Sequence, residues 1–357
     1  MSAHLLSVDN LSRDYVDHLF HVARRMEPIA QRRKITRVLE GAVLGNLFFE
    51  ASTRTRMSFH SAFSRLGGSV CDTTGFTFSS MAKGESLYDT SRVISGYVDA
   101  IVMRHPDLGS VAEFAAATHV PVINGGDGPG EHPSQALLDL YTINKEFERI
   151  GKSLPGAHLL LTGDLRYGRT VHSLLKLLSL YPPMQITLVS PPGLEMPFEL
   201  IDRAENAGHR VIQRDTLQAD YSDVDVVYAT RIQKERFTQE MVEGFSLSSD
   251  FSVDRAFLDQ RCSTHTVAMH PLPRDSRPGA NDLNVDLNGD PRLAIFRQTD
   301  NGIPVRMAIF ATLMGVDDTF DRHLRDVGWK PPHQVGVDDA LLTNGHHDQK
   351  GQGFPAL

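Results

Sequence analysis

The sequence of 357 residues has few cysteines, only Cys71 and Cys262. Two cysteines give neither a disulfide framework nor the paired spacing of a metal site, and so few thiols are typical of the reducing cytoplasm. The longest apolar runs, such as Ala42–Leu44 and Leu47–Phe49, are far shorter than the roughly 20 residues of a membrane-spanning helix. The first residues lack the basic flank and apolar core of a signal peptide. We therefore expect a cytoplasmic chain with no membrane partner.

Positive charge is also in short supply. The chain has 36 lysines and arginines against 44 aspartates and glutamates, which gives a formal net charge of −8. This acidic balance argues against nucleic acid as the main partner. The most distinctive short motifs are nevertheless rich in arginine. Local positive charge in an acidic protein is typical of a site for a small anionic ligand.

Apolar runs of strand length alternate with segments of helical period along most of the chain. Strands separated by helices imply parallel sheets that helices cover on both faces. The segment Gly151–Gly156 is the strongest boundary signal, and the alternation restarts after it. We therefore predict an α/β fold of two doubly wound parallel-sheet domains, with ligands at the carboxyl ends of the strands. The predicted strands are 41–49, 100–103, 121–124, 157–162, 185–190, 211–214, 224–229 and 266–270, and the predicted helices are 59–66, 111–118, 133–150, 170–181, 197–207 and 303–314.

Cationic, hydroxyl and amide side chains follow the ends of several predicted strands. In the first motif, Glu50–Arg56, hydroxyls and guanidinium groups precede a helix, whose free N–H groups and dipole favour an anion such as phosphate. The alternative is that the hydroxyls cap the helix and the arginines are solvated. The other strand-end motifs are Arg104-His-Pro106, His132-Pro-Ser-Gln135 after a glycine-rich loop, Gly163-Asp-Leu-Arg-Tyr-Gly-Arg169, Thr230-Arg-Ile-Gln-Lys-Glu-Arg236 and His270-Pro-Leu-Pro-Arg274.

Two of these motifs carry a further prediction. Gly163–Arg169 lacks the G-x-G-x-x-G spacing, so a dinucleotide site is weakly supported, and it offers Arg166 and Arg169 in place of an acidic ribose ligand. The peptide bond between Leu272 and Pro273 is a candidate for the cis form.

Pro304 is expected in the first turn of the last helix, where its missing N–H is tolerated.

In order and spacing, these motifs resemble those of the aspartate/ornithine carbamoyltransferase family, from about residue 5 to about residue 315. Ser52-Thr-Arg-Thr-Arg56 is typical of carbamoyltransferases in general. Lys83-Gly-Glu85, Arg231 with Gln233, and His270-Pro-Leu-Pro273 favour the aspartate branch, because ornithine enzymes typically carry His-Cys-Leu-Pro in the last motif.

The resemblance implies transfer of the carbamoyl group of carbamoyl phosphate to the amine of L-aspartate, in pyrimidine biosynthesis, without a metal or another cofactor. The catalytic residues it implies are Arg54, Thr55, Arg104 and His132. The residues it implies for carbamoyl phosphate are Ser52, Thr53, Arg54, Thr55, Arg104, His132, Gln135, Pro271, Leu272 and Pro273. Those for aspartate are Arg169, Arg231, Gln233 and Leu272, and Ser79 and Lys83 would come from a neighbouring subunit of a homotrimer.

The resemblance also implies the domain limits. Residues 1–150 would bind carbamoyl phosphate and residues 151–295 aspartate. A C-terminal helix within 296–325 would pack back on the first domain, and 326–357 is expected to be a mobile tail. The segments 237–244 and 275–290 depart from the family pattern, which leaves domain closure and regulation open. Whether a regulatory chain or another enzyme of the pathway binds the trimer is also left open.

The sequence leaves three other functions to consider. The nearest is a carbamoyltransferase for ornithine or a related amine, although Arg231 and Gln233 argue against a cationic acceptor. The second is a non-catalytic homologue that binds a phosphate metabolite. The third, a dinucleotide-dependent oxidoreductase, lacks the glycine fingerprint.

Overall fold

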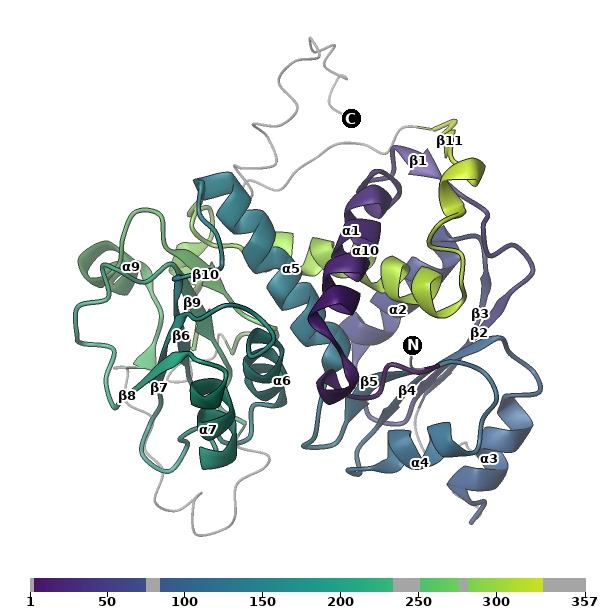
Figure 1. The fold of residues 1–357 in the computed structure, drawn as a ribbon, viewed down its shortest axis with the longest axis horizontal. Coiled ribbons are helices and arrows are strands. Elements are labelled where there is room, and N and C mark those ends of the chain that lie inside the picture. The colour runs from purple at the N-terminus through teal and green to yellow at the C-terminus, as the bar shows by residue number, and fades with distance from the viewer. Residues whose placement is uncertain (1–2, 75–83, 234–250, 276–281, 330–357) are drawn as a thin grey trace, which may run out of the picture.

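The predicted alternation forms two parallel sheets in the computed structural model, which describes residues 3–74, 84–233, 251–275 and 282–329 (Figure 1). The first sheet has four strands in the order β3-β2-β4-β5, all parallel. Its strands are β2 (Val43–Phe48), β3 (Ser69–Thr74), β4 (Ala100–His105) and β5 (Val122–Asp127).

The second sheet has five parallel strands in the order β10-β9-β6-β7-β8. The chain starts in the middle of this sheet at β6 and builds outward first on one side and then on the other. The reversal falls between β6 and β9, which is where a doubly wound sheet opens a crevice for ligands. The strands are β6 (His158–Thr162), β7 (Gln185–Val189), β8 (Arg210–Arg214), β9 (Val226–Ala229) and β10 (Val267–Met269).

Helices cover both sheets. Their bounds are α1 (Arg13–Ala30), α2 (Thr53–Arg65), α3 (Leu87–Ile94), α4 (Ser110–Ala116), α5 (Pro133–Ile150), α6 (Arg169–Leu178), α7 (Phe198–Asn206), α9 (Arg255–Arg261) and α10 (Ile295–Leu313). Short 3-10 turns lie at η1 (Val8–Asn10), η5 (Val285–Leu287) and η6 (Phe320–His323), and β1 (Lys34–Ile35) pairs antiparallel with β11 (Arg325–Asp326). None of the helices in these described parts of the chain is long and apolar enough to cross a membrane.

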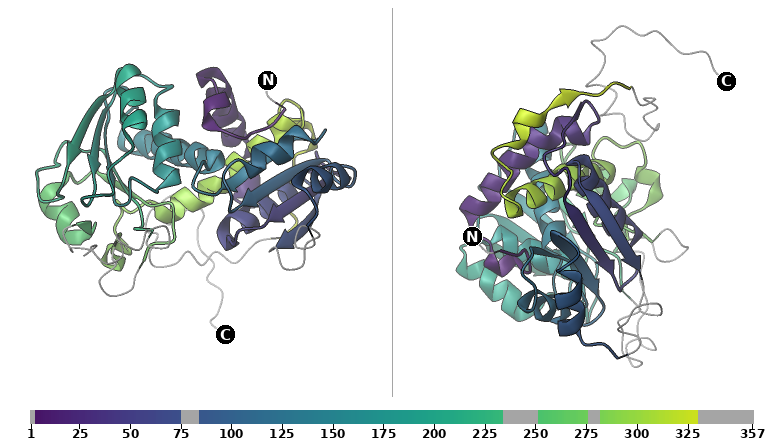
Figure 2. Two further views of the ribbon diagram at one scale, coloured as in Figure 1. Left: turned by 90° about the horizontal axis from the view of Figure 1, so that it is seen from below. Right: turned by 90° about the vertical axis from the view of Figure 1, so that its right-hand side faces the viewer.

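Two helices, α5 and α10, join the sheets (Figures 1 and 2). α10 follows the second sheet in sequence but packs against α1, α2 and α5 beside the first, as predicted. One continuous apolar core therefore includes residues of both sheets, such as Val102 and Leu161, together with Leu137 of α5 and Phe310 of α10. The wall between the two sheets is thus a packed interior, on which side chains from both can be held in place.

The last helix begins earlier than predicted. α10 starts at Ile295 rather than at Ile303, so Pro304 lies inside the helix and its expected place in the first turn is wrong. An internal proline removes a backbone hydrogen bond and costs about 3 kcal/mol. Val305, Met307 and other side chains of α10 are fully buried, and this tertiary packing stabilises the helix despite the proline.

Other predictions fare differently. The cis bond between Leu272 and Pro273 is confirmed. Of the expected tail 326–357, residues 326–329 are described and Asp326 belongs to β11, whereas 330–357 and the segment 237–244 lie outside the described residues. α5 ends at Ile150, where Gly151 takes a left-handed conformation at φ 71°, but the division into domains at residues 150 and 295 stays a prediction.

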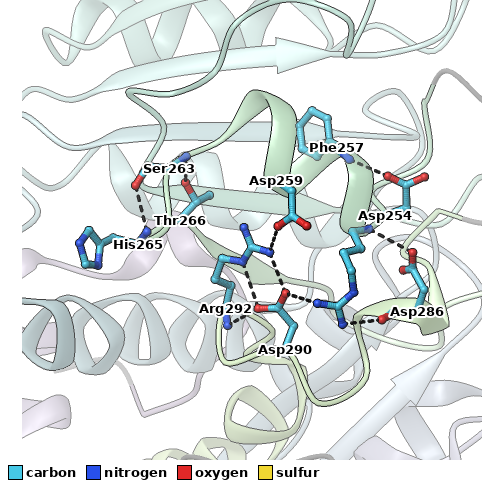
Figure 3. Close-up of polar contacts among 10 residues, drawn as sticks. Asp254, Phe257, Asp259, Ser263, His265, Thr266, Asp286, Asp290 and Arg292 are labelled. Carbon is cyan, nitrogen blue, oxygen red and sulfur yellow. Dashed lines mark hydrogen bonds and ion pairs between the residues drawn. The ribbon is translucent and has the colours of Figure 1, made fainter.

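A network of charges fixes the connection from β10 to α10 (Figure 3). Arg292 binds the Asp290 carboxylate through Nε (3.0 Å) and Nη2 (2.8 Å) and the Asp259 carboxylate at 2.5 Å. Arg255 contacts Asp290 at 3.1 Å from α9. Burial alone would raise the pKa of Asp290, whose side chain is 2% exposed, but the bonds from Arg292 hold that pKa below its usual value. The ion pairs thus anchor the chain just before α10.

Candidate active site

A cavity of about 930 Å³ lies between the two sheets. Its walls come from the N-terminus of α2, the ends of β4 and β9, the starts of α5 and α6, the segment after β10, and α10. Among the lining residues that the structure describes are five arginines and a single carboxylate, Glu50. Such a surplus of positive charge in a concave site favours an anionic ligand. The arginines are Arg54, Arg104, Arg169, Arg231 and Arg306.

The helix N-terminus predicted to bind an anion opens into this cavity. α2 begins at Thr53, with Ser52 at the N-cap position, so the hydroxyl motif forms the first turn of the helix rather than a loop before it. The Ser52 hydroxyl makes no capping hydrogen bond, which contradicts the capping part of the alternative, whereas Arg54 is exposed, as its second part expects. Partial burial nevertheless lowers the pKa of Arg54. The arrangement combines N–H donors, hydroxyls and a guanidinium, which suits a phosphate.

Glu50 brings two arginines together. Its Oε2 atom lies 2.7 Å from Nη2 of Arg104 and 3.3 Å from Nη2 of Arg169. Arg104 also donates from Nη1 to the Gly125 carbonyl at 3.3 Å. A Cβ at Gly126 would come within 2.8 Å of the Arg104 Nη1 atom, so the glycine-rich loop leaves room for this side chain.

The Arg169 side chain comes from the second half of the chain and contacts residues of the first half. It is the first residue of α6, and its guanidinium donates to the Gly128 carbonyl as well as to Glu50. Only 9% of Arg169 is exposed. The contacts hold its cationic end at the border of the two sheets, where each contributes to the cavity.

His132 occupies the N-cap position of α5 and is 4% exposed. Burial first, and then the positive charges of Arg104, Arg169 and Arg306, lower the pKa of His132 well below its usual value. The ring is therefore neutral near pH 7. A neutral imidazole can donate one hydrogen bond to a substrate oxygen without being a strong acid.

The segment after β10 is held by its own histidine. His270 is 1% exposed, its Nδ1 accepts from the Leu272 backbone N–H at 2.8 Å, and its Nε2 lies 2.9 Å from Asp282 Oδ2. Since Nδ1 is an acceptor, the ring proton is on Nε2 and is donated to Asp282. His270 is thus a structural residue. It shapes the turn at Leu272, which adopts a positive φ of 60°.

A buried aspartate, Asp164, connects the two segments that follow β6 and β9. Asp164 is fully buried, and its carboxylate accepts from the backbone N–H groups of Tyr167 (2.8 Å) and Gln233 (3.1 Å). The Gln233 side chain also donates to the Tyr167 carbonyl at 2.9 Å. A Cβ at Gly163 would lie 2.1 Å from the Thr230 carbonyl oxygen, so this close approach of two strand ends requires glycine.

The cavity gathers every predicted site residue that the structure describes. These are Ser52, Thr53, Arg54, Thr55, Arg104, His132, Gln135, Arg169, Arg231, Gln233, Pro271, Leu272 and Pro273. Ser79, Lys83 and Arg236 lie outside the described residues. Arg166 is not part of the lining; it lies over the Tyr167 ring and donates to the Gly193 carbonyl. The roles of the gathered residues stay predictions.

Sequence reasoning missed the contribution of α10. Gln298, Thr299 and Arg306 line the cavity, but the predicted helix began only at residue 303. Arg306 is fully buried, stacks over the Phe59 ring at 4.9 Å, and has a pKa that burial lowers to about 10. Its Nε atom has no hydrogen-bond partner among the described residues. A charged residue within an apolar helix was the available signal for it.

Two family models match the chain. "Aspartate/ornithine carbamoyltransferase, carbamoyl-P binding domain" matches residues 3–145, and "Aspartate/ornithine carbamoyltransferase, Asp/Orn binding domain" matches residues 155–313. The aspartate carbamoyltransferase catalytic subunit of Saccharophagus degradans is 57% identical over 92% of this chain and 97% of that protein. That of Dichelobacter nodosus is 54% identical over 95% and 97%.

Solved structures agree with these matches. The catalytic subunit of Methanocaldococcus jannaschii aspartate transcarbamoylase superposes with a TM-score of 0.78 and 39% identity, over 89% of this chain and 100% of that one. The Trypanosoma cruzi aspartate transcarbamoylase in complex with carbamoyl phosphate gives a TM-score of 0.79 and 37% identity, over 86% and 94%. Another structure of the T. cruzi enzyme holds carbamoyl aspartate and phosphate, with a TM-score of 0.76 and 37% identity over 86% and 94%.

Proposed function

The chain belongs to the aspartate/ornithine carbamoyltransferase family, and from this we infer that it transfers the carbamoyl group of carbamoyl phosphate to the amino group of L-aspartate. The products are N-carbamoyl-L-aspartate and phosphate, and the step belongs to pyrimidine biosynthesis. The observation that carries the inference is one cavity whose described lining has five arginines and one carboxylate, with both halves of the chain contributing cations. Both substrates are anions, and this cavity suits them.

The phosphate group of carbamoyl phosphate binds at the N-terminus of α2. Ser52, Thr53, Arg54 and Thr55 supply its hydrogen bonds, because they form the cap and first turn of that helix beside the cavity. The helix dipole and the free N–H groups favour the phosphate charge. Gln135 and the carbonyls of Pro271 and Leu272 hold the carbamoyl NH2 group.

Catalysis is electrostatic. The aspartate amine attacks the carbamoyl carbon, negative charge grows on the carbonyl oxygen, and Thr55, Arg104 and His132 stabilise it. One such donor typically contributes about 2.7–4 kcal/mol. The new N–C bond replaces the C–O bond to phosphate, and the departing phosphate takes the amine proton. Binding both substrates in line adds about 7–11 kcal/mol.

Aspartate binds on the side of the second sheet. Arg169, Arg231 and Gln233 line the cavity there and take its two carboxylates. The positive end of an ornithine side chain would face Arg231 instead, so the charge of the cavity supports the aspartate branch. A dinucleotide oxidoreductase finds no support, because the chain lacks the G-x-G-x-x-G spacing. A non-catalytic homologue would have the same cavity, and turnover distinguishes it from the enzyme.

We further propose that Ser79 and Lys83 complete the site from a neighbouring copy, and that the active unit is a cytoplasmic homotrimer. Support for this comes from the resemblance of Lys83-Gly-Glu85 to the family motif.

The test offers carbamoyl phosphate with L-aspartate and, separately, with L-ornithine to the purified chain. We expect carbamoyl-aspartate and phosphate in equal amounts, and no product from ornithine. Arg231→Leu should raise the KM for aspartate while the Kd for carbamoyl phosphate stays the same. Product from ornithine alone, or binding of carbamoyl phosphate without turnover, would contradict the proposed function.

A further inference from the structure

One buried carboxyl group beside the cavity has no part in the proposed reaction. Asp139 lies one helical turn beyond Gln135 on α5 and is fully buried. Its Oδ1 accepts from Nε2 of Gln135 (2.9 Å) and from Nε2 of Gln298 (2.6 Å), and its Oδ2 accepts from the Tyr228 hydroxyl (2.6 Å). It therefore ties α5 to α10 and to β9 behind the cavity wall.

The contact with Gln135 fixes which end of that amide faces a ligand. Nε2 of Gln135 is the atom that donates to Asp139, so the NH2 end of the Gln135 amide is turned to Asp139. Gln135 lines the cavity, and its carbonyl oxygen is the end left for a ligand there. An acceptor at this point binds the NH2 of a carbamoyl group but gives nothing to the methyl of an acetyl group.

The contact with Gln298 acts on the segment after β10. With its NH2 end bound to Asp139, Gln298 accepts from the His270 backbone N–H through Oε1 at 3.0 Å. This bond anchors the start of the segment that continues into Pro271 and Leu272. Asp139 therefore orients the Gln135 carbonyl oxygen directly and, through Gln298, helps to position the backbone carbonyls of Pro271 and Leu272. These are the acceptors proposed for the carbamoyl NH2.

We propose that Asp139 is a positioning residue that makes the cavity select carbamoyl phosphate over other acyl phosphates. Asp139 acts through Gln135 and Gln298 and does not touch the substrate. The inference rests on the proposed function.

The test compares Kd values of carbamoyl phosphate, acetyl phosphate and inorganic phosphate for three proteins. Asp139→Leu removes the acceptors at similar volume, and we expect its preference for carbamoyl over acetyl phosphate to fall by about tenfold or more. Its Kd for inorganic phosphate should not change, because α2 binds that group. Asp139→Asn keeps one acceptor oxygen for the two glutamines and can donate to the Tyr228 oxygen, so it should keep the preference. Asp139→Ala replaces the leucine variant if that one does not fold.

Glu146→Gln is the matched control. Glu146 is also a buried carboxylate of α5 that binds α10, through Arg297 at 2.6 Å, but it lies outside the cavity lining. This variant should lose stability and keep the preference.

The outcomes separate the two claims. Wild-type protein that binds no carbamoyl phosphate would contradict the proposed function. If the wild type prefers carbamoyl phosphate and Asp139→Leu keeps that preference, the positioning role of Asp139 is overturned. The role is also overturned if Asp139→Asn and Glu146→Gln lose as much of the preference as Asp139→Leu does.

Discussion

The Oε2 atom of Glu50 lies 2.7 Å from the Nη2 atom of Arg104, although the two residues belong to different strand ends of the first sheet. The same oxygen contacts Arg169 from the second half of the chain at 3.3 Å. Glu50 is thus an internal anion in a cavity built for anions. It holds two cations in place, and under the proposed function it would compete with the substrate phosphate for Arg104.

Glu50→Gln should therefore affect the two substrates in opposite ways. The amide keeps the shape but removes the negative charge, so Arg104 is freer to bind phosphate and the Kd for inorganic phosphate should fall or stay constant. Arg169 loses its charged partner and its fixed orientation, so the KM for aspartate should rise by about tenfold, in line with the loss of a charge-assisted hydrogen bond. Equal weakening of both ligands would contradict this division of roles.

The His132 ring should stay neutral at pH values below its ordinary pKa of 6.5, because burial and the neighbouring cations lower the pKa. In the unfolded chain it takes up a proton near that ordinary value, so the folded state loses stability from His132 as the pH falls below about 6.5. The activity profile between pH 6 and 8 should carry no inflection from this residue.

The measurement compares kcat/KM against pH for the wild type and His132→Asn. Loss of an oxyanion donor should lower kcat by about 10²–10³, while the shape of the profile is unchanged. An acid limb near pH 6.5 that disappears in the variant would show that His132 titrates there.

Local sequence signals predicted most strands and the strand-end motifs, although β3 (Ser69–Thr74) was missed. Parallel strands of one sheet align their carboxyl ends, so Arg169 and Arg231 were expected at the same edge of the second sheet. That Arg104 of the first sheet lines the same cavity depends on how the two sheets pack. α1 was missed although Ser12 caps it. α10 was predicted too short because Gly302 and Pro304 look like a helix start, and only packing from outside the segment extends it. Asp139 was missed because its carboxylate is satisfied by residues distant in sequence. Pairing of Glu50 with Arg104 likewise depends on the tertiary fold.

The network around Arg292 gives a stability prediction (Figure 3). Arg292→Met leaves the buried Asp290 with Arg255 as its remaining arginine contact, and we expect a loss of about 3 kcal/mol in the free energy of unfolding. Asp259 is 54% exposed, so Asp259→Asn should cost about 0–1 kcal/mol. Urea unfolding at one protein concentration measures both. Equal losses would mean that the Asp290 contact is no stronger than the exposed one.

Mixing two inactive variants tests whether subunits share the site. Arg54→Ala removes a cation of α2, and Lys83→Gln changes the residue proposed to reach a neighbouring subunit. In a ring of three that contains both variants, one site pairs an intact Arg54 with an intact Lys83. Random mixing in equal amounts should thus restore about one quarter of the wild-type activity. Each variant treated alone is the control, and inactive hybrid trimers, verified by charge separation, would contradict site sharing.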